Sequence, residues 1–457
     1  MRAPRLETDF AALRRQEFGR LDAAGHAYLD DTGAGVYPAS LVTQHAAMLG
    51  GWILGNPHAE SPASLASTAM IDGARRRLLQ FLDADAADYV VCFTANTTAA
   101  VALVGAAYPF GTDEPLVLTA DNHNSVNGIR EHARRAGAAV HVLPLDAELR
   151  LDAAEARLGS VRSIAGRGGL FAFPGQSNFS GVKHPLSLVR VAQGLGYRVL
   201  LDAAALLPTT RVSLRRVPAD FVALSFYKMF GYPTGIGALV ARRDALATLR
   251  RPSFSGGTVE FVSVQGDMHA MRAGAQGFED GTANFLGIPA IPAGLDFLES
   301  LGLDDVEQHV KALAMQLIDA LGALRHSGGS PLVHVYGPLD DRDRGGTVAF
   351  NVLDRSGDTI PFGRVEERAR DACLSVRGGC FCNPGASEAA FAFPADLSAR
   401  CLASTVASGW SVERFAECMA GHPVGAVRAS FGPSSNVEDM WRLVEVVRSF
   451  GEGQRDV

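Results

Sequence analysis

The sequence predicts an α/β protein built on a mostly parallel, seven-stranded sheet with helices on both faces. The first observation is a series of short, continuously apolar segments, each of the length of a buried strand. The second is that helical or loop segments separate most of them, as in sheets covered on both faces. The predicted strands are Tyr89–Phe93, Leu116–Thr119, Ala139–Leu143, Leu170–Phe173, Val199–Leu201, Phe221–Leu224 and Ala238–Val240.

With 457 residues, the chain is longer than one ordinary core requires, so we expect more than one domain. We expect residues 1–40 to form an N-terminal arm that packs with the small domain. Residues 41–300 form a large domain that contains the sheet and the binding site. Residues 301–457 form a smaller C-terminal α+β domain that carries a cysteine-bearing loop.

The smaller domain has its own secondary-structure signals. Val306–Leu324 has the apolar spacing of a helix, and Thr347–Val352 reads as a strand. Asn436, followed by Asp439 three residues later, predicts the capped start of a last amphipathic helix.

Composition excludes several classes of protein. Hydrophobic residues make up 47% and charged residues 20%, which is ordinary for a globular protein. The net charge is −7, so we expect no nucleic-acid partner. No apolar run is long enough to cross a membrane, and Met1–Arg20 lacks the apolar core of a signal peptide. Six cysteines are too few for a disulfide scaffold in a chain of this length, so we expect a reduced, cytoplasmic setting.

The residues that follow the predicted strands are the first candidates for a binding site, because ligands collect at the carboxyl ends of parallel strands. Asn96 and Thr97 open a helix after the first strand and either bind phosphate or only cap the helix. His123 follows the second strand and either stacks on an aromatic cofactor or is structural. Gln176 and Asn178 follow the fourth strand and either hold a carboxylate or a ring substituent, or shape a turn.

Asp202 and Lys228 are the two charged candidates in apolar surroundings. Asp202 ends the fifth strand, and Lys228 lies between the sixth and seventh, three residues after Ser225. A buried ammonium group is costly unless it is paired or neutral, and a Schiff base with pyridoxal phosphate (PLP) uses such a lysine. An acidic residue beside the pyridine nitrogen belongs to the same chemistry. A snorkelling lysine and a helix-capping aspartate are the alternatives.

Five of the six cysteines lie after residue 370. Cys380 and Cys382 are separated by a single residue, and no second close pair exists, so we expect no metal site. A reactive thiol on the Gly-rich loop Arg377–Gly385 is the alternative, with the arginine favouring the thiolate. Arg428 stands in an apolar segment and calls for an anion, such as a substrate carboxylate.

Taken together, these stretches resemble the cysteine desulfurase group of the class V aminotransferase fold. Within that group, the chain is most similar to the N-terminal, desulfurase-like domain of molybdenum cofactor sulfurases. The matching stretches run in the family's order over nearly the whole chain, and they include Tyr28–Ala34, Ser225–Gly237 and Arg377–Gly385. The resemblance implies the type I fold of PLP-dependent transferases.

The resemblance also implies roles at the cofactor. Lys228 forms the Schiff base, Asp202 pairs with the pyridine nitrogen, and His123 stacks on the ring. The phosphate is held by Asn96, Thr97 and Ser225. In a homodimer with shared active sites, Thr258 reaches the phosphate of the neighbouring subunit.

At the substrate, the resemblance assigns the carboxylate to Arg428 and Asn178 and the catalytic cysteine to Cys382. It implies a PLP-dependent desulfurase that takes sulfur from L-cysteine as a Cys382 persulfide and releases L-alanine. Cys380 matches a cysteine common in the sulfurase branch, and its role is open.

Other readings stay open at the level of the sequence. They are a C–S lyase, a selenocysteine lyase or an aminotransferase on the same fold, a binding protein without chemistry, and a zinc protein. Ala205 stands where many desulfurases carry glutamine, and Tyr227 where they carry histidine; we read both as subfamily features. The chain stops at Val457 without the further domain of long molybdenum cofactor sulfurases, which leaves the sulfur acceptor open.

Overall fold

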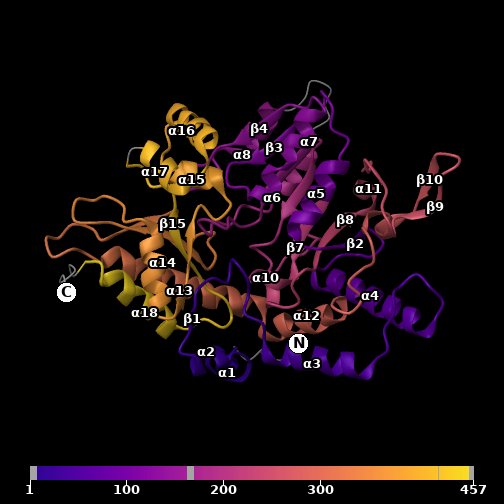
Figure 1. The fold of residues 1–457 in the computed structure, drawn as a ribbon, viewed down its shortest axis with the longest axis horizontal. Coiled ribbons are helices and arrows are strands. Elements are labelled where there is room, and N and C mark those ends of the chain that lie inside the picture. The colour runs from indigo at the N-terminus through magenta and orange to yellow at the C-terminus, as the bar shows by residue number, and fades with distance from the viewer. Residues whose placement is uncertain (1–7, 162–168, 420, 452–457) are drawn as a thin grey trace.

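The larger sheet of the protein contains all seven strands that the sequence predicts. The structure is a computed structural model that describes residues 8–161, 169–419 and 421–451. The strand order is β2-β8-β7-β6-β5-β3-β4, and β8 runs antiparallel to both of its neighbours while the other pairs are parallel (Figure 1). The mostly parallel α/β fold is therefore confirmed. The strands are β2 (Tyr89–Thr94), β3 (Leu116–Thr119), β4 (Val140–Leu143), β5 (Leu170–Pro174), β6 (Arg198–Asp202), β7 (Phe221–Ser225) and β8 (Gly237–Arg242).

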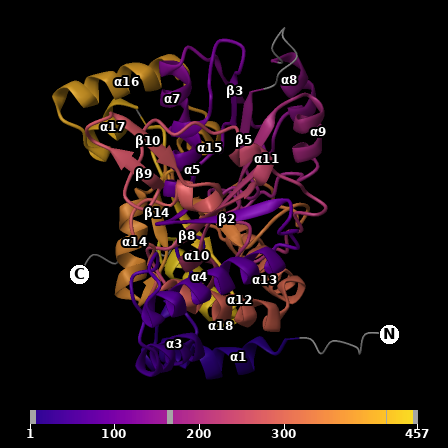
Figure 2. The same ribbon diagram turned by 90° about the vertical axis from the view of Figure 1, so that its right-hand side faces the viewer.

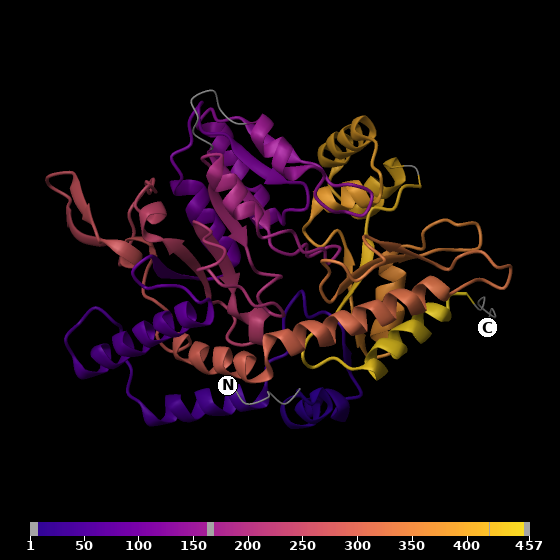
Figure 3. The ribbon, with the colours of Figure 1, turned by 180° about the vertical axis from the view of Figure 1, so that it is seen from behind.

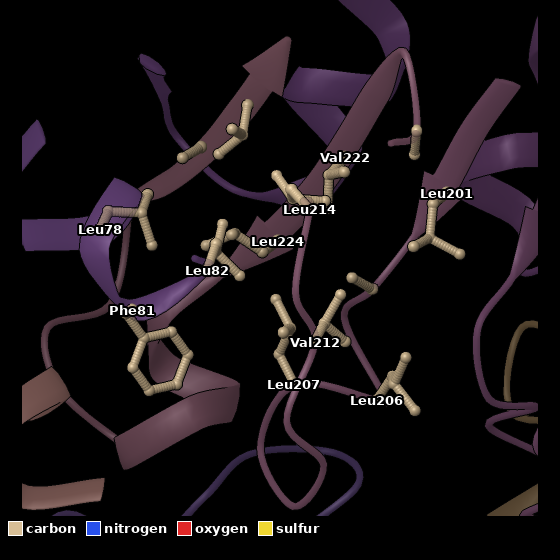
Figure 4. Packing of buried hydrophobic residues seen from close by; sticks show 14 of the residues in the cluster. Leu78, Phe81, Leu82, Leu201, Leu206, Leu207, Val212, Leu214, Val222 and Leu224 are labelled. Carbon is tan, nitrogen blue, oxygen red and sulfur yellow. The ribbon is translucent and has the colours of Figure 1, made fainter. Parts of the chain in front are cut away.

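Helices cover both faces of this sheet because its strands bury alternate side chains on opposite sides. Val222 and Leu224 pack against Leu78 and Leu82 on one face (Figure 4), and Phe221 packs in the cluster on the other. The first face is covered by α4 (Pro62–Phe81), α8 (Ala154–Ser160), α9 (Leu188–Gly194) and α12 (Ile291–Leu301). The second is covered by α5 (Thr97–Ala107), α6 (Asn124–Asn127), α7 (Ile129–Arg135) and α11 (Arg243–Leu246).

A second, antiparallel sheet lies beside the first, in the order β11-β12-β15-β14. The predicted strand at Thr347–Val352 and the predicted cap are both confirmed, since the side chain of Asn436 accepts a hydrogen bond from the backbone N–H of Asp439 at 2.8 Å. Figure 3 shows α13 and α18 side by side against this sheet. The elements are β11 (Val333–Tyr336), β12 (Thr347–Val352), β14 (Arg377–Gly379), β15 (Ala426–Ser430), α13 (Leu303–Ala323), α14 (Phe362–Asp371) and α18 (Val437–Arg448).

The N-terminal segment connects the two sheets. It contains α1 (Phe10–Glu17), α2 (Gly19–Ala23), β1 (Ala27–Tyr28) and α3 (Ala39–Gly51), and β1 pairs in parallel with β13 (Leu374–Ser375). Phe18 joins the apolar cluster of the smaller sheet.

After β1 the chain passes directly over α10 (Phe226–Phe230), where the backbone N–H of Gly35 donates to the carbonyl of Tyr227 at 3.1 Å. The division of the chain at residues 40 and 300 stays a prediction.

The remaining elements lie at the periphery. The hairpin β9 (Val259–Ser263) and β10 (Met268–Met271) projects from the larger sheet (Figure 1). On the opposite side in Figure 1, α15 (Pro384–Ala390), α16 (Ala395–Ser408) and α17 (Val412–Cys418) follow the cysteine loop, and Figure 2 shows α16 at the outer edge of the molecule. No helix in the described part of the chain is long and apolar enough to cross a membrane.

The expectation of reduced cysteines is wrong for one pair. Cys401 and Cys418 form a disulfide between α16 and α17, and their Cα atoms are 5.5 Å apart. The sequence did not indicate this pair, because the two residues are 17 positions apart and meet only once α17 packs back against α16.

The N-terminal segment crosses α10 so closely that the residue at position 231 has to be glycine, and this can be tested. Gly231 has a φ of +75°, and a Cβ there would collide with the backbone of Tyr37. Gly235 has a φ of +70° and open space around it. We expect Gly235→Ala to cost only the backbone strain of about 1–2 kcal/mol, and Gly231→Ala to cost more because the arm must also move. Urea unfolding of the two variants measures the difference, and equal losses would contradict this packing.

Candidate active site

A cavity of about 120 Å³ lies at the carboxyl ends of β5, β6 and β7. The fold brings seven of the predicted site residues to it: Asn96, Thr97, His123, Asn178, Asp202, Ser225 and Lys228. Cys382, Arg428 and Thr258 do not line it. The other lining residues are Thr98, Ser125, Pro174, Gln176, Ala204, Ala205 and Tyr227.

One end of the cavity is the N-terminus of α5. Asn96 caps this helix by accepting a hydrogen bond from the backbone N–H of Ala99 at 3.0 Å. The Oγ of Ser225 accepts from the backbone N–H of Thr97 at 2.8 Å, and the two hydroxyls are 2.7 Å apart. Gly237 allows this approach, since a Cβ there would lie 2.6 Å from the Cα of Asn96. Hydroxyls at the positive end of a helix suit a phosphate group.

Lys228 and Asp202 face the cavity from neighbouring elements. Lys228 lies on α10, directly after β7, and Asp202 is the last residue of β6. Burial lowers the pKa of the Lys228 ammonium, the charge of Asp202 opposes this shift, and the positive charges of Arg428 and Arg377 add to it. The Asp202 carboxylate is oriented by the backbone N–H of Ala204, which donates to Oδ1 at 3.0 Å. The lysine is therefore easily neutralised and suited to nucleophilic chemistry.

His123 has a defined orientation and tautomer. Its Nδ1 accepts a hydrogen bond from the backbone N–H of Ser125 at 3.1 Å, so the neutral ring carries its hydrogen on Nε2. Burial lowers the pKa of His123, and the negative charge of Asp202 opposes this shift. The lowered pKa favours the neutral ring. A neutral, flat imidazole at the cavity wall is compatible with stacking on a cofactor ring.

Gln176 lines the cavity, whereas the sequence alone left open whether it binds a ligand or shapes a turn. Its Oε1 is buried and has no hydrogen-bond partner among the described residues. The side chain lines the main cavity and also a second, smaller cavity of about 30 Å³, which Lys228 lines as well. Its position directly after β5 was the available signal, but a turn residue would have the same signal.

Asp30, from the N-terminal segment, was missed by sequence reasoning. Its buried carboxylate accepts hydrogen bonds from both arginines of the smaller sheet. The Nη2 of Arg428 donates to Oδ1 at 2.9 Å, and the Nη2 of Arg377 donates to Oδ2 at 2.5 Å. Gly33 makes room for this cluster, because a Cβ there would lie 2.6 Å from both Arg377 and Asp30. The three groups together carry one net positive charge.

Arg428 and Asn178 already have protein partners in this arrangement. Arg428 is 2% exposed, and its Nη1 donates to the backbone carbonyl of Asn178 at 3.0 Å. Its Nε is buried without a partner among the described residues. The side-chain amide of Asn178 donates to the carbonyl of Phe381 at 2.8 Å. Their assignment to a substrate carboxylate stays a prediction.

The cysteine loop lies beside the cavity. Cys382 is exposed, and its carbonyl accepts a hydrogen bond from the backbone N–H of Asn124, the neighbour of His123, at 2.7 Å. Cys380 is also exposed. The hydrogen bond to Asp30 is the largest effect that raises the pKa of Arg377, and the charge of Cys382 adds a smaller one in the same direction.

Thr258 lies apart from the cavity of its own chain. It is fully buried just before β9, where its hydroxyl donates to the carbonyl of Ser255 at 2.8 Å. Its role at a neighbouring subunit stays a prediction. Across the described ranges, no group of three or more His, Cys, Asp or Glu side chains is arranged to hold a metal ion.

A family model described as aminotransferase class V matches residues 27–443. The chain belongs to the class V aminotransferase family. It is 35% identical over 468 residues to a molybdenum cofactor sulfurase of Solanum lycopersicum, which covers 96% of this chain and 56% of the relative. The chain spans about half the length of the curated relatives it matches.

Two solved structures show the same fold. The apo structure of a cysteine desulfurase from Thermococcus onnurineus NA1 matches with a TM-score of 0.78 and 24% identity, over 99% of each chain. A mutant protein with glycine covalently linked to its PLP cofactor matches with a TM-score of 0.71 and 19% identity, over 96% of this chain and 99% of that one. The type I fold of PLP-dependent transferases is thus confirmed.

The cavity fits pyridoxal phosphate. It offers hydroxyls at a helix N-terminus, a buried carboxylate, a neutral imidazole and a lysine with a lowered pKa. With the family established, pyridoxal phosphate is the cofactor of this chain.

The shared carboxylate of Asp30 leads to a stability prediction. Asp30→Asn leaves the buried guanidinium of Arg428 without its counter-charge, so we expect a loss of about 3 kcal/mol in the free energy of unfolding. Asp340 pairs with Arg150 and Arg342, and its side chain is 49% exposed, so Asp340→Asn should cost less than about 1 kcal/mol. Urea denaturation compares the two variants. Losses of similar size would show that Asp30 does not neutralise the cluster.

Proposed function

We propose that this chain is a PLP-dependent cysteine desulfurase that transfers sulfur from L-cysteine to Cys382 and releases L-alanine. The observation that carries the proposal is the position of Cys382. Its exposed thiol stands on a loop hydrogen-bonded to the residue next to His123, which lines the cavity of Lys228. A nucleophilic sulfur beside a PLP site is the arrangement that this reaction requires.

Bound pyridoxal phosphate supplies an electron sink that weakens the Cα–H and Cβ–S bonds of an attached amino acid. Four groups of residues would hold it. Asp202 would pair with the pyridine nitrogen, His123 would stack on the ring, and Lys228 would bond to the aldehyde carbon. The N-terminus of α5 would bind the phosphate, together with the hydroxyls of Thr97 and Ser225.

Lys228 carries the proton transfers. Because burial lowers its pKa, its amine can take the proton from the substrate Cα and later return one to the product. Asp202, oriented by Ala204, supplies the negative charge that keeps a ring nitrogen protonated. His123 would cover the ring as a neutral imidazole. It would take neither the proton from the substrate Cα nor the proton on the ring nitrogen.

Cys382 accepts the sulfur. Its thiolate attacks the substrate sulfur, so that an S–S bond forms while the Cβ–S bond breaks, and the released electron pair at Cβ takes up a proton. The balance is one protein thiol and one L-cysteine in, one protein persulfide and one L-alanine out.

We also propose that two copies of the chain form a homodimer with shared active sites. The β9–β10 hairpin exposes 63% of Phe261, 94% of Val264 and 65% of Met268, and Ile53, after α3, is 85% exposed. Apolar side chains gathered on a projecting hairpin favour burial against another protein surface. Thr258 directly precedes β9, so an interface on this hairpin would bring it to the second copy.

The desulfurase proposal is tested on Cys382→Ser, with Cys373→Ser as the matched control because Cys373 is also exposed and also has a positive φ. We expect both variants to show the PLP absorption band and its change on addition of L-cysteine. Alanine formation in the presence of a thiol acceptor should fall at least roughly 100-fold in Cys382→Ser only. Full turnover by Cys382→Ser would instead favour a C–S lyase that needs no protein thiol.

The homodimer is tested with Val264→Glu, and Val142→Glu on the edge strand β4 serves as control, since Val142 is 56% exposed. We expect light scattering to give twice the chain mass for the parent and the control. A charge at Val264 should shift the protein towards the mass of one chain, because the interface would bury it. A dimer that tolerates Val264→Glu would exclude the hairpin as the interface.

A further inference from the structure

We propose that Asn383 is a positioning residue that fastens the cysteine loop to the turn carrying His123, so that Cys382 takes up sulfur from a fixed position. The inference rests on the proposed function and adds a residue to it. It also states how the loop works, because a fixed Cys382 requires the sulfur acceptor to come to the site.

The side chain of Asn383 is fully buried and uses both ends of its amide. Its Nδ2 donates to the backbone carbonyl of Asp121 at 2.7 Å and to Oδ1 of Asn178 at 2.9 Å. Its Oδ1 accepts from the backbone N–H of Ala386 at 3.2 Å, which caps α15. Only a side chain with two N–H groups and a carbonyl can satisfy all three partners at once.

Further hydrogen bonds hold the loop at Cys382 and at the residue before it. The carbonyl of Phe381 accepts from the side-chain amide of Asn178 at 2.8 Å, and the carbonyl of Cys382 accepts from the backbone N–H of Asn124 at 2.7 Å. Three consecutive residues, Phe381 to Asn383, are therefore attached to the wall of the cavity.

The turn that receives these bonds is itself fixed. The carboxylate of Asp121 is 1% exposed, and it lies 2.6 Å from Nε2 of His184 and accepts from the hydroxyl of Thr119 at 2.9 Å. Gly385 brings the loop against the backbone of Ala120, which a Cβ would prevent. The loop thus rests on a buried, hydrogen-bonded platform.

The backbone of the loop shows why it needs fastening. Phe381 and Cys382 have φ angles of +56° and +55°, a region that residues with a Cβ rarely adopt. The ring of Phe381 is buried beside Phe179 and lies under the guanidinium of Arg428, at 4.9 Å from its ring centre. Without the amide of Asn383, the two left-handed residues would relax, and the thiol of Cys382 would lose its direction.

The experiment compares Asn383→Asp with Ser387→Ala in the PLP-loaded protein. Aspartate keeps the shape and the cap acceptor but loses both donors. Ser387 is the matched control, because it is also buried and, among the described residues, its hydroxyl bonds only to the backbone carbonyl of Asn383, at 3.1 Å. Three readouts are needed: the PLP spectrum with L-cysteine, single-turnover persulfide formation on Cys382 by mass spectrometry, and hydrogen exchange of residues 380–386.

We expect Asn383→Asp to keep the spectrum and its response to L-cysteine. Exchange at residues 380–386 should rise, and persulfide formation should fall at least 30-fold, while Ser387→Ala stays within threefold of the parent. Persulfide formation at the parental rate in Asn383→Asp would overturn the proposal, as would a loss without any change in exchange.

If Asn383→Asp does not fold, Asn383→Ser is held to the same outcomes, because its shorter side chain keeps an oxygen for the helix cap and cannot satisfy both Asp121 and Asn178. If the parent forms no persulfide, the proposed function fails on its own. Hydrogen exchange and the alkylation rate of Cys382 by iodoacetamide then still decide whether Asn383 fastens the loop.

Discussion

The carboxylate of Asp30 is the interaction on which the arrangement of the site depends. It belongs to the N-terminal segment, and it accepts hydrogen bonds from Arg377 on β14 and Arg428 on β15. Two guanidinium groups this close to each other and to Lys228 would repel without an anion between them. The pairing therefore fixes the arm, the strand that leads into the cysteine loop, and the buried arginine in one unit. The arm can take this path because glycines stand where it touches Arg377 and α10.

Charges of opposite sign alternate through the site, and this determines the state of its lysine. Burial lowers the pKa of Lys228, and the two arginines of the smaller sheet lower it further. The negative charge of Asp202 raises the pKa and so opposes them. The result is an amine that changes protonation at little cost, next to a carboxylate that is held in place by the backbone. A group with that property suits repeated proton transfer to and from a substrate carbon. Burial, which disfavours the charged form of a lysine, is the largest cause of the lowered pKa of Lys228.

The two sheets supply different residues of the candidate site. The larger sheet presents Lys228, Asp202 and His123 from its strand ends, and the smaller sheet presents Arg428 and leads into the loop of Cys382. They meet where the turn after β3 accepts one hydrogen bond from Asn383 of the cysteine loop and donates one to the carbonyl of Cys382. The position of the Cys382 loop relative to the cavity of Lys228 is thus set by a few buried amide contacts between separate parts of the chain. Such contacts are rigid because each buried polar group needs its partner.

The sequence by itself determined the seven strands of the larger sheet, because continuous apolar runs are local and the pattern needs no distant residue. It also placed Asn96, His123, Asp202 and Lys228 at strand ends. It did not give the role of Asp30, which lies 347 residues before Arg377, or the contacts of Asn383 to residues more than 200 positions away. The pairing of Cys401 with Cys418 was equally hidden. Ion pairs, amide contacts and disulfides form between groups that are close in space. The packing of the two sheets decided the partners of Asp30 and Asn383, and the packing of α17 against α16 decided the disulfide.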